Sequence, residues 1–212
     1  MSYQRKLKGL YVITDDTLTP DEILYIQVED AIKGGATIVQ LRDKKSNDEQ
    51  IEKKAIRLQQ LCKKHNVLFV LNDKIDLAIK LQCDGLHIGK SDHENFVKIR
   101  ENFDGIIGVS CYGDINKAKH FELLGANYVA FGSFYSSPTK PDSNIVPLET
   151  IALAKEKLNI PVCVIGGINT TNLDAIMSYK PDMVSVISDI WNSSNIKRQA
   201  KVYATTIKEK KI

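Results

Sequence analysis

The sequence predicts an α/β fold, a closed (β/α)8 or TIM barrel of parallel strands, each followed by a helix. Short apolar runs alternate with amphipathic segments along the chain, and eight such units fit within 212 residues, close to the size of about 250 residues typical of this barrel. An open doubly wound sheet shares this alternation but needs a glycine-rich fingerprint after its first strand. Thr14-Asp15-Asp16 stands there instead. We therefore expect one barrel domain over residues 1–212.

Each strand is predicted from a short apolar run with β-branched or aromatic residues, which is typical of a strand buried in a parallel sheet. The expected strands are 10–13, 37–41, 67–71, 85–88, 105–109, 128–131, 162–165 and 183–187. Helices are expected from about residue 20, over 48–65 and 76–82, from residue 92, and over 115–124, 148–158, 173–179 and 196–210. Pro20 beside Asp21 suits the start of the first helix.

Composition excludes several classes of protein. The net charge of +3 is spread along the chain, so no basic block indicates a nucleic acid or a membrane surface as partner, while small anionic substrates fit. No apolar run is long enough for a signal peptide or a bilayer span. The four cysteines form no C-x-x-C pair and no zinc-ligand spacing with histidine. We expect reduced thiols in a cytoplasmic protein, and a homo-oligomer is compatible with the sequence.

The stretch 128–141 is an apolar run that breaks at Gly132 and leads into Ser137, Pro138, Thr139 and Lys140. Prolines on both sides restrict the backbone around Thr139 and Lys140, at the carboxyl end of a predicted strand. Hydroxyls and an ammonium held in this way are the composition of an anion site. Taken in isolation, the same residues are also typical of an ordinary loop.

The barrel prediction brings the residues that follow each strand to one rim, where barrel enzymes keep their active sites. Gly166 and Gly167 follow the seventh strand, with Ile187 and Ser188 after the eighth, which is where such barrels bind a phosphate on backbone N–H groups. The alternative is that the glycine pair merely forms a tight turn.

A second anion site is expected at the same rim. Arg42, Lys44 and Lys140 supply positive charge, whereas Asp73 and Asp92 are acidic. Two carboxylates suit a Mg²⁺ ion shared with a diphosphate, because Mg²⁺ usually takes one or two protein carboxylates and substrate phosphates. Each aspartate alone could instead be a helix cap. Two sites together suggest one substrate with a diphosphate and a second with a monophosphate.

Several motifs, in their order along the chain, resemble those of the thiamine-phosphate synthase family. They are Gln40-Leu-Arg-Asp-Lys44, Asn72-Asp73, Asp84-Gly-Leu-His-Ile-Gly89 with Asp92, Gly108-Val-Ser110, Phe131-Gly132, Ser137-Pro-Thr-Lys-Pro-Asp142, Ile165-Gly-Gly-Ile168 and Val186-Ile-Ser188. The resemblance covers nearly the whole chain and implies a transferase. That enzyme joins hydroxymethylpyrimidine diphosphate to thiazole phosphate by breaking the pyrimidine C–O bond first.

The resemblance also implies a role for each matching residue. The pyrimidine diphosphate would be held by Gln40, Leu41, Arg42, Asp43, Lys44, Asn72, Ser110 and Lys140, of which Arg42, Lys44, Ser110 and Lys140 would be catalytic. The thiazole phosphate would be held by Ser137, Pro138, Thr139, Gly166, Gly167, Ile187 and Ser188. Asp73 and Asp92 would bind Mg²⁺.

Two positions depart from the family pattern: Lys90 stands where glutamine is usual, and Cys111-Tyr112 replaces a threonine-histidine or similar pair. Because His87 lies within a predicted strand, we expect it to be a packed structural residue, and we expect Cys111 to be a small packing residue. Two other functions remain open, namely a thiazole tautomerase of the related branch and a non-catalytic barrel that binds a phosphate metabolite.

Overall fold

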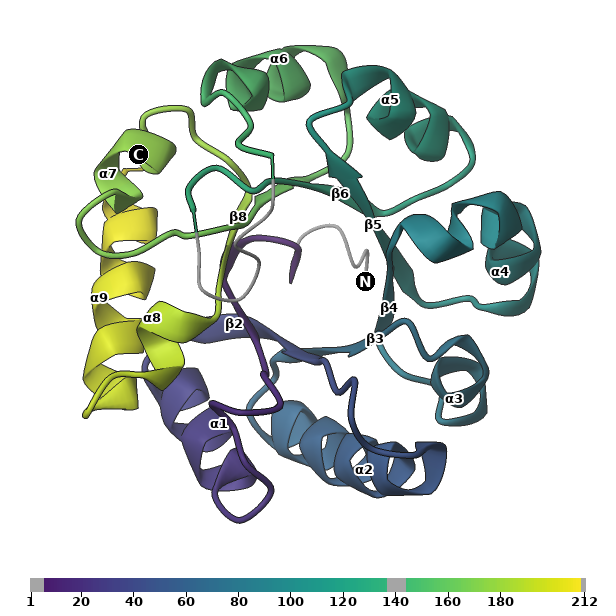
Figure 1. The fold of residues 1–212 in the computed structure, drawn as a ribbon, viewed down its shortest axis with the longest axis vertical. Helices are drawn as coiled ribbons and strands as arrows, with labels where there is room; N and C mark the ends of the chain where they lie inside the picture. The colour runs from purple at the N-terminus through teal and green to yellow at the C-terminus, as the bar shows by residue number, and fades with distance from the viewer. Residues whose placement is uncertain (1–5, 137–143, 211–212) are drawn as a thin grey trace.

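The computed structural model describes residues 6–136 and 144–210, and these residues form a closed barrel of eight strands surrounded by helices (Figure 1). The strands are β1 (Gly9–Ile13), β2 (Ala36–Leu41), β3 (Leu68–Asn72), β4 (Gly85–Ile88), β5 (Ile106–Tyr112), β6 (Tyr128–Phe131), β7 (Val162–Val164) and β8 (Met183–Val186). Neighbouring strands pair in parallel in sequence order, and β1 also pairs with β8, which closes the ring. The predicted fold class is therefore confirmed.

The helices lie outside the ring of strands in Figure 1. They are α1 (Leu24–Lys33), α2 (Asp48–Lys64), α3 (Ile75–Lys80), the 3-10 helix η2 (Lys90–Asn95), α4 (Phe96–Asn102), α5 (Ile115–Leu123), α6 (Glu149–Lys157), α7 (Leu173–Met177), α8 (Ser188–Trp191) and α9 (Ile196–Glu209). In the described ranges, no helix is long and apolar enough to cross a membrane.

Most element boundaries agree with the sequence prediction, but three differ in ways that affect the site. Strand β5 continues to Tyr112, so Ser110 lies within the strand and not after it. Helix α1 begins at Leu24, after a turn over residues 21–23, and the N–H of Leu24 donates to the carbonyl of Pro20 at 2.9 Å. The short helix α8 was not predicted, since four residues are too few to show a helical period.

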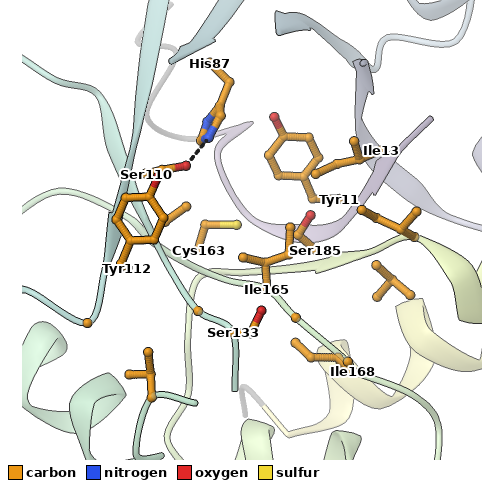
Figure 2. A pocket seen from close by; sticks show the side chains of 18 of the residues that line it. Tyr11, Ile13, His87, Ser110, Tyr112, Ser133, Cys163, Ile165, Ile168 and Ser185 are labelled. Atoms are coloured by element: carbon orange, nitrogen blue, oxygen red, sulfur yellow. Dashed lines mark hydrogen bonds between the residues drawn. The ribbon is translucent and has the colours of Figure 1, made fainter. Parts of the chain in front are cut away.

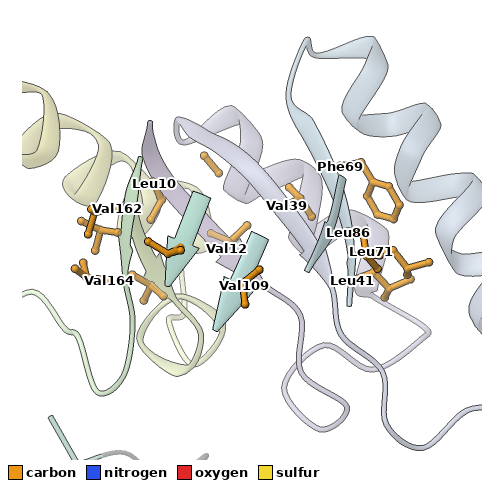
Figure 3. Packing of buried hydrophobic residues seen from close by; sticks show 14 of the residues in the cluster. Leu10, Val12, Val39, Leu41, Phe69, Leu71, Leu86, Val109, Val162 and Val164 are labelled. Carbon is orange, nitrogen blue, oxygen red and sulfur yellow. The ribbon is translucent and has the colours of Figure 1, made fainter. Parts of the chain in front are cut away.

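Successive side chains along each strand point alternately into two apolar layers, one between the strands and the helices and one inside the barrel. Outward-facing residues pack between the strands and the helices, as Figure 3 shows for Leu10, Val39 and Leu41 among others. Inward-facing residues fill the barrel itself and include Tyr11, Ile106, Tyr128, Cys163 and Met183. The period of two along each strand thus decides which side chains can reach the interior.

Leu41 and Asp43, both expected to bind substrate, have structural side chains. Leu41 is 2% exposed and packs in the outer layer. The Asp43 carboxylate follows β2, accepts hydrogen bonds from the N–H groups of Lys45 and Ser46, and pairs with Lys54 of α2 at 2.8 Å. These contacts tie the β2–α2 loop to its helix, so neither side chain faces the barrel interior.

Gly108 makes room for an inner-layer ring. A Cβ atom added there would overlap the ring of Tyr128, the residue that pairs with Gly108 across β5 and β6. Gly108→Ala should therefore lower the free energy of unfolding by about 1–3 kcal/mol, the usual cost of overpacking, measured by urea denaturation. Gly113→Ala is the control, because its Cβ would meet only the side chain of Val146 at 3.3 Å. Equal losses in the two variants would contradict this account.

The Asp43 contacts predict a pH-dependent stability. Burial raises the pKa of this carboxyl, but hydrogen bonds from Lys54 and Ser46 outweigh burial and hold the pKa well below its ordinary value. Asp43→Asn should lose about 1–3 kcal/mol of stability at pH 7. Because the folded-state pKa is depressed, that stability is fully present above the unfolded pKa of about 3.9 and is lost as the pH falls below it.

Urea denaturation of the wild type and Asp43→Asn at pH 7 and pH 3.5 measures this difference. The exposed pair of Glu49 and Lys53 supplies the control variant Glu49→Gln, which should change stability little at either pH. An Asp43→Asn protein of unchanged stability whose KM for substrate is raised would instead support a binding role for Asp43.

Candidate active site

A cavity of about 590 Å³ opens at the end of the barrel formed by the carboxyl ends of the strands. Its lining combines inward-facing strand residues with the loops that follow (Figure 2). The sequence-predicted residues that line it are Gln40, Arg42, Asn72, Ser110, Gly166, Gly167, Ile187 and Ser188. Residues from β2, β3 and β5 thus share one cavity with residues that follow β7 and β8.

Four further predicted residues, Ser137, Pro138, Thr139 and Lys140, lie outside the described residues. The structure gives no geometry for their expected roles, so these roles stay predictions. Leu41, Asp43, Lys44, Asp73 and Asp92 are described but do not line the cavity.

The glycine pair after β7 has a backbone suited to an anion. Gly166 and Gly167 have φ values of +105° and +63°, and a Cβ on either would overlap Ser133 or the backbone oxygens of residues 135 and 136. Side chains are therefore excluded from this turn. Among the described residues, the N–H groups of both glycines find no backbone acceptor, so within that part of the chain neither donor is used, as an anion site on N–H groups requires.

The acidic side of the site is organised around Gly89, at the end of β4. Asp73 accepts a hydrogen bond from the N–H of Gly89 at 3.2 Å, and the N–H of Asp92 donates to the carbonyl of Gly89 at 3.1 Å. Asp73 also forms an ion pair with Lys44. The Asp73 carboxylate thus contacts the first residue after β4 and a predicted catalytic lysine, and Asp92 lies in the turn that follows Gly89.

The charge state of Asp73 suits a metal ligand. Burial raises the pKa of this carboxyl, but the hydrogen bond and charge of Lys44 outweigh burial and lower it, so the carboxylate is ionised at neutral pH. Within the described ranges, no cluster of three or more histidine, cysteine or acidic residues could hold a metal. Two carboxylates with further oxygens from substrate and water are a donor set that Mg²⁺ accepts, so the residues present fit this ion.

His87 lies in the cavity wall, although we expected a packed structural residue. It occupies the inward face of β4, opposite Asn72 of β3 and Gly108 of β5. Its Nε2 lies 2.9 Å from Ser110 Oγ, the contact drawn in Figure 2. The sequence contained a signal for this position. Side chains alternate between the two faces of a strand, so His87, which lies between the outward-facing Leu86 and Ile88, must face inward.

Other cavity residues were missed for a different reason. Tyr11, Ser133, Asn144, Thr150 and Ser185 line the cavity but carry no motif. Ser185 is 2% exposed, and its Oγ finds no hydrogen-bond partner among the described residues. A polar group of a bound substrate would satisfy that hydroxyl.

The cysteines do not supply a nucleophile to this site. Cys111 lies in the outer layer, and burial raises the pKa of its thiol to about 12. This agrees with the prediction of a packing residue. Cys163 does line the cavity, but burial likewise raises the pKa of its thiol. Both thiols stay protonated at neutral pH and are weak nucleophiles.

Comparisons with known proteins agree with this geometry. A sequence model of the family described as thiamine monophosphate synthase matches residues 10–190. The thiamine-phosphate synthase of Wolinella succinogenes is 42% identical over 200 residues, covering 92% of each chain, and that of Picrophilus torridus is 43% identical over 192 residues, covering 90% of this chain and 92% of its own. Thiamine phosphate pyrophosphorylase from Pyrococcus furiosus has a TM-score of 0.87 at 31% identity, covering 99% of each chain. The chain therefore belongs to the thiamine monophosphate synthase family, whose members are transferases.

Proposed function

We propose that this enzyme joins hydroxymethylpyrimidine diphosphate to thiazole phosphate and releases pyrophosphate and thiamine phosphate; a thiazole that carries a carboxyl group would also lose it as CO2. The observation that supports this best is the division of one cavity between two sets of anion-binding groups. Arg42, Asn72 and Ser110 come from one part of the ring of strands, and Gly166 and Gly167 come from another. Two anionic substrates can therefore meet in one place.

The roles that we assign to individual residues are those that the family resemblance implies. Arg42 and Ser110 would bind the diphosphate together with Lys44 and Lys140, while Gln40 and Asn72 would contact the pyrimidine side. The N–H groups of Gly166 and Gly167, with Ile187 and Ser188, would bind the phosphate of the thiazole, and the resemblance assigns Ser137, Pro138 and Thr139 to the same substrate. Holding both substrates in line supplies much of the rate acceleration.

Asp73 and Asp92 would hold Mg²⁺ against the diphosphate. The ion, when bound, neutralises charge that collects on the leaving pyrophosphate. Because Lys44 pairs with Asp73, the same lysine can turn its ammonium to the pyrophosphate when the carboxylate engages the ion. Arg42, Lys44 and Lys140 then share the stabilisation of the leaving group.

A dissociative reaction suits these groups. The pyrimidine C–O bond would break first, both electrons leaving with the pyrophosphate oxygen, and the thiazole nitrogen would then donate its lone pair to the pyrimidine-methyl cation. This sequence needs no protein nucleophile, in agreement with the protonated thiols of Cys111 and Cys163. We also propose that the enzyme works in the cytoplasm on these small molecules.

The alternative functions account for fewer features. A thiazole tautomerase or a phosphate-metabolite sensor would use the glycine pair, but neither needs Asp92 together with Asp73 and its ion-pair partner Lys44. A transferase uses all three residues.

One experiment tests the proposal directly. The protein is mixed with hydroxymethylpyrimidine diphosphate, thiazole phosphate and Mg²⁺, and thiamine phosphate is measured by chromatography. We expect product with Mg²⁺ and none after chelation with EDTA. Release of pyrophosphate without thiamine phosphate, or full activity in EDTA, would contradict the proposal.

The acidic pair gives a sharper prediction. Asp73→Asn and Asp92→Asn should abolish product formation, because the metal loses a ligand, while binding of thiazole phosphate, measured by calorimetry, survives. The matched control is Asp104→Asn, an exposed aspartate before β5 at the opposite end of the barrel, which should keep wild-type turnover. Wild-type turnover in Asp92→Asn would remove Asp92 from the metal site.

Lys140 gives a second prediction. Lys140→Ala should lower kcat by about 10²- to 10³-fold, the usual loss when one charge-stabilising donor is removed, measured by steady-state kinetics at saturating substrate. A full rate would show that the positive charge comes from Arg42 and Lys44 alone.

A further inference from the structure

An unbroken chain of hydrogen bonds crosses the inside of the barrel and ends at Ser110. Gln40 Nε2 donates to the hydroxyl of Tyr11 at 2.6 Å, and the hydroxyls of Tyr11 and Tyr128 lie 3.0 Å apart. The Tyr128 hydroxyl lies 2.9 Å from His87 Nδ1, and His87 Nε2 lies 2.9 Å from Ser110 Oγ. Five side chains from β2, β1, β6, β4 and β5 thus form one connected network.

Burial makes this network costly to build for packing alone. Gln40 and Tyr11 are each 1% exposed, and Tyr128 is fully buried. Apolar side chains of similar size would fill the same volume without polar groups that need partners. The ring of Tyr128 occupies the space that a side chain at position 108 would fill, and Gly108 has none. The same ring stacks on His87, with ring centroids 5.7 Å apart. We therefore look for the role of the network at its end, where His87 contacts the hydroxyl of Ser110 in the cavity lining.

The network has a direction. Gln40 contacts Tyr11 through its amide nitrogen, which can only donate. Burial raises the pKa of both tyrosines, so each keeps its proton and donates once. In the arrangement in which each hydroxyl donates once within the network, Tyr11 donates to Tyr128 and Tyr128 donates to His87 Nδ1. A neutral imidazole that accepts at Nδ1 carries its proton on Nε2, and this N–H points at Ser110 Oγ.

We propose that His87 is a positioning residue that acts through Ser110. By donating to Ser110 Oγ, it occupies a lone pair of the hydroxyl and leaves the Ser110 O–H to donate to an oxygen of the diphosphate. Tyr128, Tyr11 and Gln40 hold His87 in the tautomer that this requires. The inference rests on the proposed function, because that function supplies the anion which Ser110 contacts.

The test is a double-mutant cycle on Ser110 and His87, with two measurements: kcat for thiamine phosphate formation and the Kd for inorganic pyrophosphate with Mg²⁺. His87→Leu should lower kcat and raise this Kd, each by about tenfold, the value of one hydrogen bond to a charged group. In the Ser110→Ala background, His87→Leu should have no further effect on either quantity. His87→Gln, whose amide can reach the position of Nε2, should restore most of the loss.

Two further variants supply a substitute for His87→Leu and a control for the double-mutant cycle. Tyr128→Phe retains the ring that packs on Gly108 but removes the hydroxyl, so it replaces His87→Leu if that variant fails to give a cooperative thermal transition. In the Ser110→Ala background, Tyr128→Phe should likewise cause no further change in kcat or in the Kd for pyrophosphate. Tyr203→Phe is the matched control, because it removes a buried hydroxyl that contacts Asp189 at 2.6 Å outside the network. Any change that Tyr203→Phe causes in kcat or in the Kd for pyrophosphate should add, as a free energy, to the change caused by Ser110→Ala.

Several outcomes would overturn the inference. Additive losses for His87→Leu and Ser110→Ala would make His87 a packing residue, as would a His87→Gln variant no better than His87→Leu. Unchanged pyrophosphate affinity in Ser110→Ala would remove the contact through which His87 acts. A wild type that binds pyrophosphate but makes no thiamine phosphate would instead contradict the proposed function, and the cycle on pyrophosphate affinity would still decide the role of His87.

Discussion

Closure of eight parallel strands into one hydrogen-bonded ring is the constraint on which the rest of the molecule depends. Because β1 pairs with both β2 and β8, every strand has two neighbours and runs in the same direction. All carboxyl ends therefore meet at one rim. Residues as far apart as Gln40 and Ser188 line one cavity for this reason alone.

The same geometry separates stability from chemistry along each strand. Outward residues such as Val39 and Leu86 pack under the helices, and inward residues such as Ile106 and Met183 fill the lower barrel. Nearer the carboxyl ends, the inward positions become polar, as Gln40 and Ser110 illustrate. Polar groups are thus placed where a substrate can satisfy them, above an apolar floor that keeps their positions fixed.

Sequence reasoning could predict what alternation and chain order determine. The barrel and the position of the glycine pair at residues 166–167 after the seventh strand follow from these patterns. Because a motif was carried over as a block, the sequence did not show that strand parity turns the Leu41 side chain outward or that Lys54, from the next helix, engages Asp43. The partners of His87 could not be predicted, since they depend on the register of β4, β5 and β6.

In this structure one rim of the barrel carries the described residues that we assign to both anion sites and to the acidic pair. The most direct measurement is a crystal structure of the protein with thiamine phosphate, pyrophosphate and Mg²⁺. We expect the monophosphate on the N–H groups of Gly166 and Gly167, pyrophosphate between Arg42 and Ser110, and the ion in contact with Asp73 and Asp92. Pyrophosphate at the opposite end of the barrel, or an ion that neither aspartate contacts, would contradict this account.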